Sequence, residues 1–307
     1  MTEGSKKAII AAFFANLGIA IAKFVGFIIT GSAGMLAEAV HSMADTGNQG
    51  LLMLGGRRAR RKATTKHPFG YGRERYFWAF AVALVLFSMG GLFALYEGIE
   101  KFRHPHEVES IWVGVVILLI AIALESWSLR TAVKESTHVK GEGVGWWRFI
   151  RTSKQPELPV VLLEDTGAEI GLFLALFGLL MAHWTGDGRW DALGSAAIGL
   201  LLITIAIVLM IEMKGLLIGE AASTAHVEAI TKAISDSPHV DSVIHMRTEH
   251  LGPDEILVTA KVEYDSRLTF DEVAEAINAS EANVRAAVPA ARLIYIEPDL
   301  KRPAVAE

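Results

Sequence analysis

The stretch Ser32–Gly55, SAGMLAEAVHSMADTGNQGLLMLG, combines an apolar composition with four polar side chains in helical spacing. These are Glu38, His41, Asp45 and Asn48, and steps of three or four residues place them on one face of a helix. An ionisable residue within a membrane is costly and commonly marks an ion pathway. His41 and Asp45, one turn apart, are types that chelate a divalent metal. A polar pair that only holds helices together is the alternative, and the residues alone leave the two evenly balanced.

Composition limits the classes of protein that this chain can represent. Its 307 residues are 52% hydrophobic, and the mean hydropathy of +0.37 is high for a soluble protein. The chain has no cysteine, so a metal site must use His, Asp, Glu, Asn or backbone oxygen. We find no nucleophile–base set and no phosphate-binding glycine loop. We therefore expect neither an enzyme nor an organic cofactor.

Long apolar runs in the first two thirds of the chain predict a polytopic α-helical membrane protein. Each run is near the ~20 residues that cross a bilayer core. The second and fifth contain charges, and polar residues within a span usually face the bundle interior. A six-helix transmembrane domain is predicted over residues 1–215, with spans at 8–29, 33–55, 77–98, 111–133, 158–182 and 191–213.

Basic residues predict the orientation in the membrane. They concentrate in the second and fourth loops, and cytoplasmic loops carry an excess of Lys and Arg. Both termini are therefore expected in the cytoplasm, and a bacterial inner (cell) membrane is the simplest location. The same rule accounts for the arginines, so we expect no nucleic-acid partner. The basic residues of the two loops are Arg57, Arg58, Arg60, Arg61, Lys62, Lys66, Arg73 and Arg75, and then Lys134, Lys140, Arg148, Arg151 and Lys154.

Residues 216–307 predict a small α+β cytoplasmic domain of ferredoxin-like order αββαβ. HVEAITKAISD has helical periodicity, and Val240–Thr248 and Glu255–Tyr264 alternate as strands do. LTFDEVAEAINASEANVRAAV predicts a second helix, with Thr269 as N-cap before Glu272. The segment ARLIYIEPD predicts the last strand.

Together these features resemble the cation diffusion facilitators, a family that includes the zinc transporters of animals. NLGIAIAKFVGFIITGSAGMLAEAVHSMADTGNQGLL is similar to the family's first two helices, and HPFGYGRER to its loop before the third helix. LLEDTGAEIG and WDALGSAAIG are similar to its fifth helix and the start of its sixth. HSMADTGNQ and LLEDT resemble the branch that contains a mitochondrial zinc exporter of animals.

The resemblance implies a homodimer, formed through the transmembrane and C-terminal domains, that exchanges a divalent metal for protons by alternating access. Zn²⁺ is the expected cargo. An oxygen-rich site with one His also suits a manganese or iron exporter, and Co²⁺ is a further candidate. A non-transporting partner subunit of a heterodimer is a third alternative.

The fifth helix should supply the remaining metal ligands. The family places two of them four residues apart there, and if Asp165 is the second, the first falls on Val161, which cannot ligate. Glu169, one turn from Asp165, or Glu164 would then complete the site, or water would fill the missing position; we rank the two glutamates in that order after Asp165. The alternative role of Glu164 is a cap or interfacial residue near the helix start.

Other polar residues of the spans have open roles. Glu125 could line the route, carry protons or pair with Lys23. Glu38 is expected at the outer approach to the site and Asn48 at its fringe. Asp191 is expected to cap its own helix. Metal binding requires neutral imidazole and ionised carboxylate, so protons and metal would compete at the site.

Two further metal positions of the family are incomplete in this chain. Its loop site needs a second His four residues after His67, where this chain has Tyr71. The last strand, IYIEPD, and the strand EILVTAKVEY lack the expected His, and the histidines of this domain are expected to be solvated. We therefore predict no loop site and a dimerisation domain with a reduced or absent metal cluster.

Overall fold

The computed structural model describes residues 3–105 and 110–301, with side chains from Leu17 onward. It divides into two compact units, one of residues 1–57 and 76–214 and the other of residues 58–75 and 215–307. The sequence had assigned the loop 58–75 to the membrane domain, whereas it groups with the second unit. Opposite charges explain this, because Arg73 pairs with Glu249 and Arg75 Nη1 lies 3.0 Å from Asp254 Oδ2.

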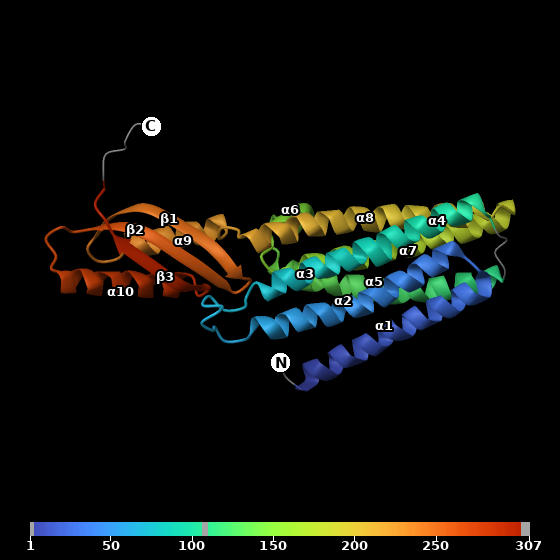
Figure 1. Ribbon diagram of the computed structural model, residues 1–307, viewed down its shortest axis with the longest axis horizontal. Coiled ribbons are helices and arrows are strands. Elements are labelled where there is room, and N and C mark those ends of the chain that lie inside the picture. Colours follow the sequence, from blue (N-terminus) through green and yellow to red (C-terminus); the bar gives the residue numbers. More distant parts are fainter. Residues whose placement is uncertain (1–2, 106–109, 302–307) are drawn as a thin grey trace, which may run out of the picture. The chain divides into compact units, whose positions relative to one another are not determined.

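The first unit is built from long helices that run side by side (Figure 1). Each predicted span coincides with one long helical segment. The short helix α6 was not predicted, since its few residues carry little periodic signal. The segments are α1 (Glu3–Thr30), α2 (Ala33–Ala59), α3 (Glu74–Val85) continued by η1 (Leu86–Leu92) and α4 (Phe93–Arg103), α5 (Ile111–Val139), α6 (Trp146–Thr152), α7 (Glu157–Thr185) and α8 (Arg189–Ile218).

Three of these segments, within the residues that the structure describes, are long and apolar enough to cross a membrane. They are Glu74–Arg103, Ile111–Val139 and Arg189–Ile218, and the described part of α1, Leu17–Thr30, is a shorter apolar helix. Helices α2 and α7 carry the ionisable residues singled out above. The unit is thus a helical membrane-type domain, and the number of six crossings stays a prediction.

The third predicted span is interrupted by the π-helical segment η1, which hydropathy did not reveal. A π-segment inserts extra backbone into a helix and is often found at functional sites. The helix α4, which comes directly after η1, makes close contacts with α8. A Cβ at Gly98 would lie 2.5 Å from the backbone N of Ala196, and one at Gly199 equally close to that of Leu95. Glycine therefore lets α4 and α8 approach closely, as small residues do between membrane helices.

The turn between α1 and α2 is fixed by a side chain from a distant helix. Asp191, the third residue of α8, accepts hydrogen bonds from Ser32 Oγ and the backbone N–H groups of Ala33 and Gly34. A carboxylate at a helix N-terminus satisfies its free N–H groups and the helix dipole. Asp191 therefore caps α2, and the prediction that it caps its own helix was wrong.

The second unit contains the predicted αββαβ order (Figure 1). Its elements are α9 (Thr224–Ser235), β1 (Val240–Gly252), β2 (Glu255–Tyr264), α10 (Phe270–Ala287) and β3 (Ala291–Pro298). The sheet order is β1-β2-β3, with β1 antiparallel and β3 parallel to β2. A small α+β domain is thereby confirmed.

The central strand β2 and both helices build the core of this unit. Alternate β2 residues from Ile256 to Tyr264 are buried against Ile230 and Ile234 of α9 and Val284 of α10. Such period-two burial means that one sheet face is covered by helices. The predicted cap is also present: Thr269 Oγ1 accepts from the Glu272 N–H, and the Glu272 carboxylate accepts from the Thr269 N–H.

Candidate metal site in the helical unit

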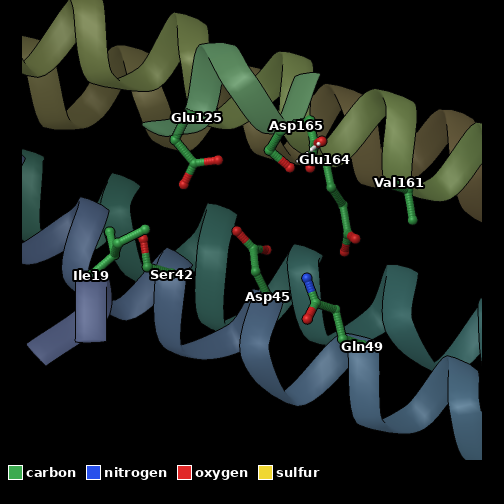
Figure 2. A pocket seen from close by; sticks show the side chains of 9 residues that line it. Ile19, Ser42, Asp45, Gln49, Glu125, Val161, Glu164 and Asp165 are labelled. Carbon is green, nitrogen blue, oxygen red and sulfur yellow. Dashed lines mark hydrogen bonds between the residues drawn. The ribbon is translucent and has the colours of Figure 1, made fainter. Parts of the chain in front are cut away.

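A small cavity lies among α2, α5 and α7, and four carboxylates line it. In Figure 2, Asp45 extends from α2 towards Glu125 of α5 and towards Glu164 and Asp165 of α7. The cavity volume is about 30 Å³, enough for one particle of the size of a water molecule. Carboxylate oxygens from three helices therefore face a space that fits one small cation.

On α2, the predicted pair His41 and Asp45 lies together, but only Asp45 reaches the cavity wall. The distance from His41 Nε2 to Asp45 Oδ2 is 3.4 Å. His41 is fully buried, and in the described part of the chain neither ring nitrogen has a hydrogen bond. The ring lies near the π-segment, since a Cβ at Gly90 would be 3.8 Å from His41 Nδ1. The imidazole thus adjoins the cavity through Asp45.

On α7, the neighbours Glu164 and Asp165 both line the cavity. Glu164 Oε1 accepts a 2.7 Å hydrogen bond from Asn48 Nδ2, and Asp165 Oδ2 a 2.9 Å bond from Ser128 Oγ. Glu164 is the eighth residue of α7 and is buried, so its interpretation as a cap or interfacial residue was wrong. Val161 also lines the cavity, but its hydrocarbon side chain has no atom that can bind a metal.

Glu169, ranked above Glu164 from the sequence, does not line this cavity. Its Oε1 accepts a 2.7 Å hydrogen bond from Ser126 Oγ on the exposed side of α5. Helical spacing does place Glu169 one turn from Asp165, but the cavity lies on the side of α7 that Glu164 shares. Of the predicted fifth-helix residues, the structure brings Glu164 and Asp165 to one space and leaves Glu169 outside it.

A second polar cluster, centred on Lys23, borders the cavity. Lys23 Nζ donates to Glu38 Oε2 at 3.1 Å and to Ser42 Oγ at 2.7 Å, and it lies 3.9 Å from Glu125 Oε1. Glu38 is fully buried, and its Oε1 occupies the space that a Cβ at Gly171 would need. Glu38 is thus a buried partner of Lys23, and its place at an outer approach to the site stays a prediction.

The side chains are not arranged as a finished coordination shell. In residues 3–105 and 110–301, no group of three or more His, Asp or Glu side chains is placed to hold a metal ion. The cavity instead gathers carboxylates that a small movement could bring onto one cation. Such a cavity can attract and partly dehydrate a divalent ion, since hard oxygen ligands suit these ions.

The histidines outside the bundle are placed singly. The His67 ring packs against Tyr71, the residue that replaces the second loop His, with ring centroids 4.7 Å apart. His226, His239 and His245 are exposed, as expected. His250 differs from the prediction, because it is buried and its Nδ1 lies 3.2 Å from the Gly252 carbonyl oxygen.

Comparisons with known proteins agree with this architecture. The family profile of the cation efflux transmembrane domain matches residues 9–242. The "Proton-coupled zinc antiporter SLC30A9, mitochondrial" of Homo sapiens is 30% identical over 267 residues, which cover 87% of this chain and 47% of that protein. The "Zinc transporter ZitB" of Escherichia coli is 27% identical over 255 residues, covering 81% and 75%.

The chain spans about half the length of the SLC30A9 relatives that it matches. Among solved structures, a C-terminal domain of MamM is 22% identical, with a TM-score of 0.24, and covers 25% of this chain and 96% of that one.

Proposed function

This chain belongs to the cation efflux family of membrane metal transporters, and from this premise we propose that it exports Zn²⁺ in exchange for protons. The observation that supports the proposal is the cavity where Asp45 of α2 meets Glu164 and Asp165 of α7. Oxygen ligands on two helices can follow an ion as the helices move. Alternating access to the two sides of the membrane would carry the ion across.

The nitrogen ligand of the proposed zinc site is His41. Zinc accepts mixed imidazole and carboxylate ligands, typically four in number. His41 Nε2 lies 3.4 Å from Asp45 Oδ2. A modest rotation of the His41 side chain would therefore let it bind the same ion as Asp45. Glu164, rather than Glu169, takes the place that Val161 leaves without a ligand.

Proton exchange follows from the same ligands. Carboxylates must be ionised and imidazole neutral before a metal binds, so binding releases protons. An imidazole also changes its charge between pH 5 and 8, within the physiological range. Metal and protons would therefore compete for one site, which is a physical basis for antiport.

A manganese or iron exporter of the same family is the second candidate. Among the residues that the structure describes, four carboxylates and no imidazole line the cavity itself, and a set rich in oxygen suits these harder ions. Cobalt is a further possible cargo. Val161 in the cavity wall keeps a third candidate, a non-transporting partner subunit.

We further propose a homodimer in a bacterial inner membrane with both termini in the cytoplasm. Residues 1–215 would form the six-span domain and residues 216–307 a cytoplasmic dimerisation domain. The concentration of Lys and Arg in two loops supports this orientation. Those basic side chains would also meet anionic lipid head groups.

The test is metal uptake into proteoliposomes that contain the full chain. Zn²⁺, Mn²⁺, Fe²⁺ and Co²⁺ are compared with and without a pH gradient, with Asp45→Asn as the impaired variant and Glu169→Gln as the control outside the cavity. Zinc uptake that follows the pH gradient and is lost only in Asp45→Asn is expected. If the folded, reconstituted protein carries none of the ions, the proposal is overturned.

A further inference from the structure

We propose that Lys23 is an affinity-limiting residue of the cavity: a tethered cation that competes with the transported metal for Glu125. This inference rests on the proposed function, because it assigns a further role at the same site. It concerns a side chain that does not line the cavity but contacts two residues that do, Ser42 and Glu125.

Burial makes the position of Lys23 costly unless its charge is compensated. Its side chain is fully buried, and an apolar groove between α1 and α5, lined by Ala22, Ala121 and Leu124, adjoins it. An ammonium in such surroundings needs opposite charge close by. Lys23 therefore depends on carboxylates of its neighbouring helices.

The two carboxylates near Lys23 are held differently. Glu38 accepts a hydrogen bond at 3.1 Å, whereas Glu125 Oε1 is 3.9 Å away, beyond hydrogen-bonding distance. Glu38 is fully buried, while the Glu125 side chain is 16% exposed and lines the cavity. Glu38 is thus the fixed partner and Glu125 the one that can turn towards an ion.

Electrostatics gives this arrangement a consequence for the metal. An ammonium near 4 Å offsets much of the charge of Glu125. A divalent ion that binds Glu125 must therefore displace this carboxylate from its interaction with Lys23. Transport needs binding that is strong enough to capture an ion but weak enough to release it. Four uncompensated carboxylates would hold the ion too firmly, and Lys23 reduces that hold.

A purely structural role would predict a different result. If the Lys23–Glu38 pair only joins α1 to α2, its removal as a pair changes stability and leaves zinc affinity unchanged. Removing both charges together also avoids an uncompensated buried charge, which is the costly outcome of a single substitution.

The experiment measures the zinc dissociation constant of the full chain in detergent by competition with a chelator. The double variant Lys23→Met with Glu38→Gln is expected to bind zinc about tenfold more tightly than the wild type. In a Glu125→Gln background the same double variant should give no further tightening, because the contested ligand is gone. Lys23→Arg keeps the charge and should bind as the wild type does.

A matched control removes an opposite-charge pair elsewhere in the unit. Lys101 Nζ lies 3.6 Å from Glu97 Oε1 at the end of α4, and Lys101→Met with Glu97→Gln should leave zinc affinity unchanged. Unchanged or weaker binding in the Lys23/Glu38 variant, or tightening that persists with Glu125→Gln, overturns this inference alone. A wild type that neither binds nor carries metal overturns the proposed function, and this inference with it.

Discussion

Asp191 and Asp45 are both aspartates of the helical unit, yet their surroundings differ. Asp191 is 2% exposed and accepts hydrogen bonds from Ser32 and from the first N–H groups of α2. Asp45 Oδ1 is buried without a hydrogen bond in the described residues, and three other carboxylates face the same cavity. Most buried polar groups in proteins have partners. The supply of donors thus separates a carboxylate that stabilises a helix start from one available to a cation.

The strongest test of this contrast is Asp45→Asn. We expect zinc uptake into proteoliposomes to fall by roughly 100-fold, because a ligand of the ion is lost. Thermal stability should not fall, since the substitution removes a poorly compensated charge. A variant that loses stability but keeps its uptake would reverse the contrast, making Asp45 structural.

Asp191→Ala should show the opposite behaviour. We expect the free energy of unfolding to drop by about 2–3 kcal/mol, because the Ser32 hydroxyl and the start of α2 lose their charged acceptor. Zinc affinity of the folded fraction should stay as in the wild type. Titration with denaturant and chelator competition measure the two quantities, and a selective loss of affinity would place Asp191 in the site instead.

Glu164 and Glu169 of α7 give a matched pair of substitutions, and the expected effect is of intermediate size. Glu164→Gln should weaken zinc binding about tenfold, whereas Glu169→Gln should leave it unchanged. Both substitutions preserve shape and remove one charge, so only the position differs. Equal effects on the dissociation constant would mean that the cavity does not define the site.

The smallest effect is expected where a satisfied carboxylate lies in water. In the second unit, the Arg267 side chain and backbone N–H hold the pKa of Asp265 at about 2, below the ordinary value of ~3.9. A lowered pKa contributes stability above the ordinary value, and this is lost as the pH falls from about 4 to 2. Asp265→Asn should slightly flatten the acid side of the melting-temperature profile. Screening by water keeps the change small, and an unaltered profile would show that the pair contributes nothing.

Local geometry explains which parts of the site could be predicted. His41 and Asp45 lie one turn apart on a single helix, so their proximity follows from chain spacing alone. The choice between Glu164 and Glu169 depends on how α7 is rotated about its axis, and no local pattern records that angle. Val161 indicated that one expected ligand position has no ligand. Only the fold showed which glutamate lines the cavity together with Asp165.

The sequence by itself determined the family, the helical membrane-type unit, the αββαβ unit and the proximity of His41 and Asp45. These follow from hydrophobic periodicity and helical spacing, which act over a few residues. Tertiary structure alone decided that Glu164 enters the cavity, that Lys23 lies between Glu38 and Glu125, and that Asp191 caps α2. Each of these joins residues far apart in the chain, because side-chain partners across helices depend on packing, which spacing along one helix does not encode.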